Sequence, residues 1–242
     1  DVNYLKNIPA GIVIADLSLK KQLNSHKSKA IVFSETPKLT FLHMLQKYCD
    51  DSFERTTEDT GNVSQKATIE STVILGENCE IYPQSVVCGN TVMGSNCRVL
   101  SGTIIGVAGL GDLWEGERFY RFTHIGGVVI EDNVSIGTNV SILKGMLEDT
   151  TIGSGTKIGS NVSIGHSVQI GKNCYISSGV TIGGACIIED NTWLAVGCTL
   201  KDHVNVGQNT MIGTGAVLMK DALPDSLYLG NPARKVGERN GH

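Results

Sequence analysis

Aliphatic residues recur at every sixth position across the second half of the chain. An amphipathic helix would repeat its apolar face at intervals of three and four, and an ordinary strand would alternate at two. A fixed period of six instead predicts a solenoid, in which stacked hexads bury one another's apolar side chains. The twelve positions are Ile152, Ile158, Ile164, Ile170, Ile176, Ile182, Ile188, Leu194, Leu200, Val206, Ile212 and Leu218.

A smaller residue follows four positions after each aliphatic residue, so every hexad offers one large and one small inward side chain. Because free Cys behaves as a small hydrophobe when buried, we interpret five of the seven cysteines as core fillers. The sequence has no C-x-x-C pair, which favours reduced thiols in a cytoplasmic protein. The five are Cys79, Cys97, Cys174, Cys186 and Cys198.

A less regular array of hexads runs from Val63 to Ile105, and the period then breaks. The inserted loop, residues 106–127, contains one of the two Trp residues and two of the five Phe residues. Long loops in compact folds are usually functional or disordered, and a disordered loop would not concentrate aromatic residues. We therefore predict a loop that faces a substrate, with packing of the aromatic rings on the solenoid wall as the alternative.

A second irregularity separates Ile142 from Ile152, which are ten residues apart where two hexads would give twelve. The segment 143–150 must therefore form a distorted coil. Distorted backbone beside regular coils is a plausible place for a functional site.

The first 58 residues do not follow the repeat. Residues 11–16 and 30–35 are rich in β-branched side chains and predict two short strands. Thr36 and Pro37 then supply an N-cap and a first helical residue, followed by Leu residues at helical spacing. We expect a small α/β unit.

Composition and charge exclude several classes of partner. The net charge is −4 without long runs of like charge, so nothing favours binding to nucleic acid or to an anionic membrane. No run of eighteen apolar residues and no signal segment occurs, so we expect no membrane insertion and no export.

The hexads resemble those of the left-handed parallel β-helix acyltransferases. Residues 130–171, IEDNVSIGTNVSILKGMLEDTTIGSGTKIGSNVSIGHSVQIG, resemble the UDP-3-O-acylglucosamine N-acyltransferases of the lipid A pathway, and the similarity extends back through residues 121–130. The ending differs, because residues 215–236, with GNPARK near their close, resemble CoA-dependent sugar N-acetyltransferases. The resemblance covers most of the chain.

This resemblance implies a mainly β fold with eighteen residues in each coil and a homotrimer with active sites between subunits. The expected organisation is an α/β unit at residues 1–58, a left-handed parallel β-helix at residues 59–224 with the loop 106–127 inserted, and a CoA-side tail at residues 225–242. Eighteen-residue coils would place His166 beneath Gly184 and Gly184 beneath Asp202.

The same resemblance assigns the catalytic residues. His166 matches the family's catalytic His, and an imidazole that titrates near neutral pH suits a general base. Gly184 lies one coil on, where the family places a backbone N–H near the thioester oxygen. Ser167 follows the base where relatives have an acidic residue or Asn, so Glu148 or Asp149 is the expected orienting carboxylate if one reaches His166.

The remaining candidate residues would bind the two substrates. We assign the acceptor sugar to the inserted loop and the distorted coil, through Trp114, Tyr120, Arg121, His124 and Lys144. We assign the phosphates of acetyl-CoA or another acyl-CoA, a co-substrate and not a permanent cofactor, to Lys220, Asn231, Pro232, Arg234 and Lys235. No metal site is expected.

The sequence thus favours a cytoplasmic N-acyltransferase, most simply an N-acetyltransferase, acting on a nucleotide-linked amino sugar for surface polysaccharide. One alternative is a UDP-3-O-acylglucosamine N-acyltransferase that uses 3-hydroxyacyl carrier protein. Two others are a metal-dependent β-helix hydratase, which would need three His ligands, and a purely structural β-helix.

Overall fold

The computed structural model describes residues 12–20, 30–37, 40, 44, 63–115, 117–121 and 124–239. The chain divides into two units, Asp1–Glu58 and Asp59–His242. Within the described residues, no helix reaches the length and apolarity that crossing a bilayer would require.

The first unit contains a parallel pair of strands, β1 (Ile12–Asp16) and β2 (Ala30–Ser34), as the β-branched segments predicted. A 3-10 turn, η2 (Leu17–Leu19), follows β1, and the Asp16 carboxylate caps it by accepting a hydrogen bond from the Ser18 N–H at 2.8 Å. The backbone is helical at residues 37, 40 and 44. The rest of the predicted helix and Cys49 lie outside the described residues.

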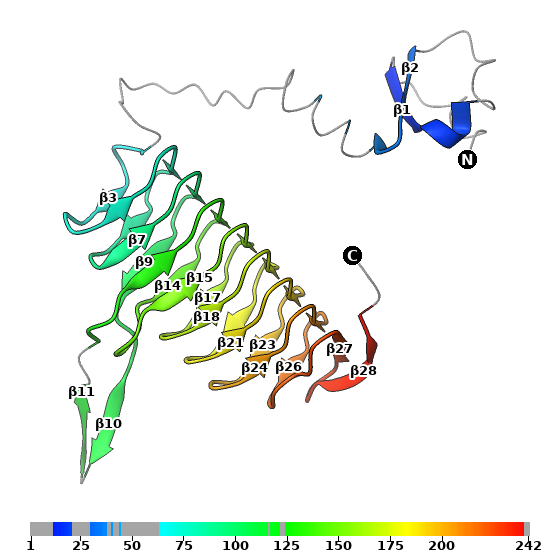
Figure 1. Ribbon diagram of the computed structural model, residues 1–242. Helices are drawn as coiled ribbons and strands as arrows, with labels where there is room; N and C mark the ends of the chain where they lie inside the picture. The colour runs from blue at the N-terminus through cyan, green and yellow to red at the C-terminus, as the bar shows by residue number, and fades with distance from the viewer. Residues whose placement is uncertain are drawn as a thin grey trace. The chain divides into compact units, whose positions relative to one another are not determined.

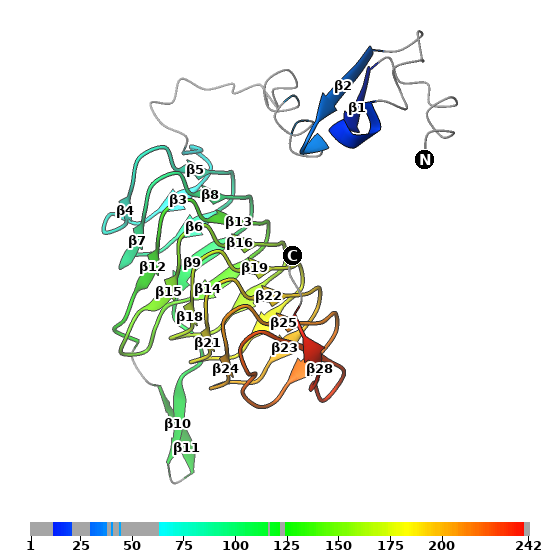
Figure 2. The same cartoon turned by 45° about the vertical axis from the view of Figure 1, so that its right-hand side comes forward.

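The second unit is a solenoid whose coils each cross three parallel sheets, visible as a ladder of short arrows in Figures 1 and 2. Sheet 1 contains β4 (Ile74–Leu75), β7 (Thr91–Met93), β12 (Val128–Ile130), β15 (Thr150–Ile152), β18 (Gln169–Ile170), β21 (Ile187–Ile188) and β24 (Asn205–Val206). Sheet 2 contains β5 (Glu80–Ile81), β8 (Arg98–Val99), β13 (Ser135–Ile136), β16 (Lys157–Ile158), β19 (Tyr175–Ile176), β22 (Trp193–Leu194), β25 (Met211–Ile212), β27 (Ser226–Leu229) and β28 (Arg234–Glu238). Sheet 3 contains β3 (Thr68–Ile69), β6 (Val86–Val87), β9 (Ile104–Val107), β14 (Ser141–Leu143), β17 (Ser163–Ile164), β20 (Thr181–Ile182), β23 (Thr199–Leu200) and β26 (Val217–Leu218). The predicted parallel β-helix is confirmed.

The coil length and the inward positions are also as predicted. Ile152 pairs with Ile170, and Ile164 pairs with Ile182, so regular coils contain eighteen residues. Every large position from Ile152 to Leu218 is buried, and so is every small position from Thr156 to Ala222. All five predicted core cysteines, two of them in the first array, are buried as well. Alternating large and small residues therefore fill a narrow interior without thick aromatic packing.

Several polar side chains at the small position hydrogen-bond inside the solenoid, whereas the buried Thr91 hydroxyl has no hydrogen-bond partner among the described residues. The hydroxyls of Thr103 and Thr156 donate to the carbonyls of Gly137 and Gly171 at 2.7 and 2.9 Å. The Cys186 thiol donates in the same way to the Lys201 carbonyl at 3.1 Å. Thr and Cys can therefore replace Val or Ala at positions such as these three, because the buried donor finds a turn carbonyl in the next coil.

The chain turns at three corners in each coil, and only one corner varies in length. Between β3 and β24, every turn from sheet 1 to sheet 2, such as residues 171–174, has four residues, as does every turn from sheet 2 to sheet 3. The corner where the chain passes from sheet 3 to sheet 1, called here the 3–1 corner, has 20 residues at 108–127 and six at 144–149. Both predicted irregularities thus fall on one edge of the solenoid.

Two hairpins depart from the regular coils. β10 (Asp112–Glu115) and β11 (Arg118–Arg121) form an antiparallel hairpin within the inserted loop, and this hairpin projects away from the solenoid in Figures 1 and 2. At the C-terminal end, β27 continues sheet 2 beside β25, and β28 folds back antiparallel to β27. A cis peptide joins Asn231 to Pro232 in the turn between them.

Candidate active site

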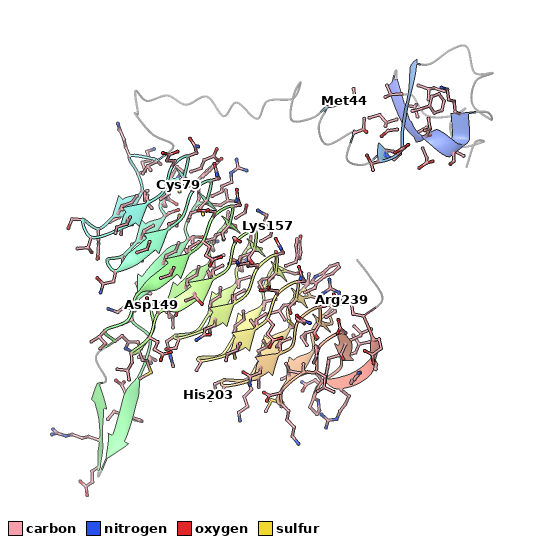
Figure 3. All side chains as sticks on the ribbon, viewed as in Figure 1. Met44, Cys79, Asp149, Lys157, His203 and Arg239 are labelled. Carbon is pink, nitrogen blue, oxygen red and sulfur yellow. The ribbon has the colours of Figure 1, made fainter. Side chains whose placement is uncertain are left out.

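The predicted catalytic pair lies on the 3–1 corner, on two successive coils. The Ala185 N–H donates to the His166 carbonyl at 2.8 Å, and the His203 N–H donates to the Gly184 carbonyl at 2.9 Å. His166, Gly184 and Asp202 therefore stack in the predicted order. Figure 3 shows Asp149 and His203 along this same edge of the solenoid.

The imidazole of His166 lies against the backbone of Gly184. A Cβ added to Gly184 would sit 2.6 Å from His166 Nε2 and 2.7 Å from its Cε1. Any larger residue would thus push the ring away, which gives Gly184 a steric reason to be glycine. Within the described part of the chain, the Gly184 N–H donates no hydrogen bond, so it remains available as a donor.

The protonation of His166 is set by its surroundings. Burial lowers the pKa of the imidazole below its usual value, and the nearby His124 and His203 lower it further. The Nδ1 atom is buried and has no hydrogen-bond partner among the described residues. A neutral imidazole, the form that a general base requires, is therefore favoured near neutral pH.

His124 is the second imidazole of the site. It is 5% exposed, and its ring meets the His166 ring edge to face, with the centroids 5.8 Å apart. The base of the inserted loop packs beside this pair, because a Cβ on Gly111 would lie 2.7 Å from His124 Cε1. Residues far apart in the sequence are thereby brought together at one corner.

Between Gly155 and Gly215, the backbone of this corner is strained where the other two corners are not. The third residue after each aliphatic position adopts a positive φ, and from Gly155 to Gly215 it is Asn or Gly at every corner except the 3–1 corner. The exceptions are Ser167 (φ 56°), Ala185 (φ 54°) and His203 (φ 59°). Residues other than Gly and Asn rarely adopt this conformation, and such outliers cluster at functional sites.

Neither carboxylate of the distorted coil orients His166. Asp149 Oδ1 instead accepts the Gly127 N–H at 2.6 Å, joining the distorted coil to the end of the inserted loop. Glu148 is exposed, and the buried Nδ1 of His166 accepts or donates no hydrogen bond among the described residues. The condition for an orienting carboxylate, that Glu148 or Asp149 reaches His166, is therefore not met by any hydrogen bond in the described part of the chain.

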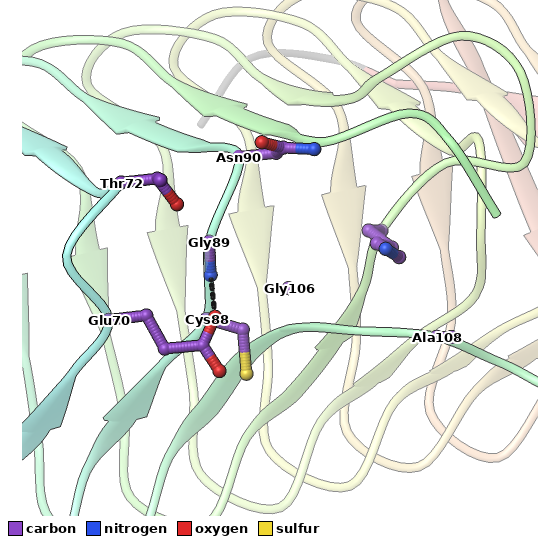
Figure 4. A pocket seen from close by; sticks show the side chains of 8 residues that line it. Glu70, Thr72, Cys88, Gly89, Asn90, Gly106 and Ala108 are labelled. Atoms are coloured by element: carbon purple, nitrogen blue, oxygen red, sulfur yellow. Dashed lines mark hydrogen bonds between the residues drawn. The ribbon is translucent and has the colours of Figure 1, made fainter.

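A polar cavity of about 400 Å³ opens further along the same corner, toward the N-terminal coils (Figure 4). Lys144, predicted to bind the acceptor, lines it together with Glu70, Cys88 and Asn90. The Glu70 carboxylate accepts the Gly89 N–H at 2.6 Å, while Lys144 Nζ has no ion-pair partner among the described residues. Of these residues, only Lys144 was predicted from the sequence to bind the acceptor.

The other predicted acceptor residues belong to the projecting hairpin. Trp114 lies on β10, and Tyr120 and Arg121 lie on β11, but their side chains are outside what the structure describes. Their assignment to the acceptor stays a prediction. Phe119, on the same hairpin, is 66% exposed.

The predicted donor residues occupy the C-terminal end of the second unit. Lys220 follows β26 on the 3–1 corner, whereas Asn231, Pro232, Arg234 and Lys235 belong to the exposed hairpin of β27 and β28. Lys235 Nζ pairs with Glu238 at 2.8 Å, and the Arg234 guanidinium donates to the Ala233 carbonyl at 3.0 Å. The CoA assignment remains a prediction.

Comparison with known proteins supports this architecture. Residues 149–184, which include His166 and Gly184, match the family model described as bacterial transferase hexapeptide (six repeats). The chain contains hexapeptide repeats of this kind. The predicted resemblance to hexapeptide-repeat acyltransferases is confirmed.

The curated relatives of this hexapeptide-repeat protein are named acyltransferases. It is 34% identical over 96 residues to the UDP-3-O-acylglucosamine N-acyltransferase of Caulobacter vibrioides, covering 40% of this chain and 28% of the relative. It is 32% identical over 149 residues to the enzyme of the same name from Methylobacterium sp., covering 62% of this chain and 42% of the relative. The chain thus spans less than half the length of these relatives.

Solved structures share the solenoid. A UDP-N-acetylglucosamine acyltransferase from Bacteroides fragilis superimposes with a TM-score of 0.61 and 25% identity, covering 73% of this chain and 74% of that one. The UDP-N-acetylglucosamine acyltransferase from Campylobacter jejuni gives a TM-score of 0.58 and 24% identity over the same shares. The second likeness supports the fold alone.

Proposed function

We propose that the protein is an N-acyltransferase that joins an acyl group to the amine of a nucleotide-linked amino sugar, with His166 as the general base. The observation that carries the proposal is the stacking of the His166 imidazole on Gly184 at the strained 3–1 corner. The names of the curated relatives point to the same reaction class.

In this reaction the amine nitrogen attacks the carbonyl carbon of the acyl thioester, and His166 accepts the amine proton. The Gly184 N–H donates to the oxyanion of the tetrahedral intermediate, a contribution that grows as negative charge develops. The C–S bond then breaks, and the sulfur leaves with a proton from the imidazolium. The lowered pKa of His166 keeps the imidazole ready to accept a proton at neutral pH.

The sequence favoured acetyl transfer from acetyl-CoA. The names of the curated relatives instead favour acyl transfer to UDP-3-O-acylglucosamine as the acceptor. The 3-hydroxyacyl carrier protein expected from the resemblance would be its donor. The polar cavity with Lys144 and Glu70 would bind the hydroxyl and phosphate groups of the acceptor, because it opens on the same corner as His166.

Acetyl-CoA is the second candidate donor, and the C-terminal hairpin favours it. Arg234 and Lys235 are exposed on β28, and because Lys235 pairs with Glu238, Arg234 is the cationic side chain more available to phosphates. We further propose a cytoplasmic homotrimer, since the 3–1 corner is an outer edge of the solenoid and a neighbouring copy would supply the opposite wall. Sedimentation equilibrium showing a fully active monomer would contradict this assembly.

The decisive experiment measures turnover with each donor and acceptor pair. The purified protein would be assayed with 3-hydroxyacyl carrier protein and UDP-3-O-acylglucosamine, and separately with acetyl-CoA and UDP- or dTDP-linked amino sugars. We expect turnover with one pair and its near-complete loss in His166→Ala. Absence of acyl transfer with every pair would reject the proposed function, and acetyl transfer alone would reject the carrier-protein reaction.

A further inference from the structure

Met146, in the middle of the distorted coil, is held from both sides. Its N–H donates to Ser167 Oγ at 3.1 Å, and its carbonyl accepts the Ile125 N–H at 2.9 Å. Ser167 directly follows His166, and Ile125 directly follows His124. One peptide segment therefore connects the backbones that carry the two imidazoles.

Ser167 also fixes both ends of the distorted coil. The Ser167 N–H donates to Thr150 Oγ1 at 2.9 Å, and the fully buried Thr150 hydroxyl donates to the Leu143 carbonyl at 2.8 Å. Leu143 and Thr150 flank the six-residue turn, and Met146 lies within it. The turn is thus tied to the His166 corner at its beginning, middle and end.

The identity of Ser167 is not explained by its backbone conformation. At φ 56° the position would suit Asn or Gly, which occupy the other corners of the regular coils. Ala185 adopts nearly the same φ, 54°, on the next coil without any hydroxyl. The Ser167 hydroxyl is therefore explained by the acceptor that it provides for Met146.

We propose that Ser167 is a positioning residue, which acts through Met146 to hold the His124 ring against the His166 ring. The inference rests on the proposed function for its catalytic consequence only. The edge-to-face geometry, with centroids 5.8 Å apart and planes at 78°, is what the contact preserves. The simpler alternative is that this hydrogen bond stabilises the turn and does nothing else.

The test compares Ser167→Ala with Ser178→Ala in the full chain. Ser178 is a matched control, because its hydroxyl also accepts a backbone N–H, that of Ser160 at 3.2 Å, but at the corner between sheets 2 and 3. Ser167→Gly is the second variant, since Gly adopts the positive φ without strain and so protects against misfolding.

The first readout is NMR of the imidazole side chains, which needs no substrate. We expect Ser167→Ala and Ser167→Gly to shift the ring signals of both His124 and His166, and Ser178→Ala to leave them unchanged. The pKa of His166 should rise toward its usual value as the ring becomes more exposed. The titratable groups that influence it are His124 and His203. Unchanged ring signals in both Ser167 variants would overturn the proposal.

The second readout is steady-state kinetics with whichever substrates the parent protein accepts. Misplacement of a reacting group by about 1 Å can cost about 100-fold in rate, so we expect kcat to fall by roughly 10-fold or more with KM nearly unchanged. The melting temperatures of Ser167→Ala and Ser178→Ala should be similar. Equal kcat in these two variants would reject the positioning role. If the parent transfers no acyl group, the proposed function fails, and the NMR comparison still decides this inference.

Discussion

Replacing Gly184 by Ala tests whether His166 works from the position that the structure gives it. The new Cβ would lie 2.6 Å from His166 Nε2, whereas ordinary contacts begin at 3.4 Å. The imidazole must therefore move by about 0.8 Å, the difference between these distances, because the backbone of Gly184 is held by the next coil through His203. The N–H of residue 184 is retained, so only the position of the ring changes.

We expect kcat/KM to fall by about 10- to 100-fold, since a displacement approaching 1 Å can cost about 100-fold. The assay is initial-rate kinetics with the substrates identified for the parent protein. Gly197→Ala is the control, because a Cβ there meets nothing within 4 Å and its φ of 67° is close to that of Ala185. That variant should lose about 1 kcal/mol of stability from backbone strain and keep its activity.

A double-mutant cycle identifies the cause. In a His166→Ala background there is no ring to displace, so adding Gly184→Ala should change the residual rate by no more than about 2-fold. A further loss as large as that in the parent background would show that Gly184 acts independently of His166. Displacement of the His166 ring could then not be the cause of the lost activity.

Three other predictions concern the base, the donor and the core. His166→Ala should lower kcat by roughly 10²- to 10⁴-fold. Because burial lowers the pKa of His166 from 6.5, kcat/KM of the parent protein should fall only when the pH drops below 6.5. A decrease in kcat/KM that begins above pH 6.5 would contradict the assignment of His166 as the base. Arg234→Ala should weaken acetyl-CoA binding, measured by calorimetry, by about 1 kcal/mol, or roughly 5-fold. Lys235→Ala should have a smaller effect, because Lys235 is already paired with Glu238. Unchanged affinity in Arg234→Ala would show that this hairpin does not bind the donor. Alkylation of the native protein should be faster at Cys88 than at the buried Cys174 and Cys198, whose pKa values burial raises to about 11 and about 12; rapid labelling of the buried pair would contradict the inward assignment.

The solenoid could be predicted in detail because its physical rule is local and repeated. Each hexad must present one large and one small side chain inward, so the period alone identified residues such as Ile164 and Cys174 as buried. The stacking of His166 on Gly184 follows from the same arithmetic, because eighteen residues make one coil.

The side-chain contacts around His166 could not be predicted from the six-residue period. The Ser167–Met146 hydrogen bond and the pairing of His124 with His166 depend on how two irregular segments fold back, and no period governs those segments. One signal was present in the sequence, however. From Gly155 to Gly215, the third residue after each aliphatic position is Asn or Gly except at Ser167, Ala185 and His203, so the strained corner could have been located from that pattern.

The restriction of unequal turns to the 3–1 corner separates the scaffold from the chemistry. Ile130 pairs with Ile152 although 22 residues separate them, and with Met93 although 37 do, so extra residues are looped out before the next rung begins. The turns that lead from sheet 1 to sheet 2 and from sheet 2 to sheet 3 keep four residues before and after each insertion. New loops could therefore be exchanged at this one edge, altering which molecules reach His166, while the buried rows of Ile and Val remain undisturbed.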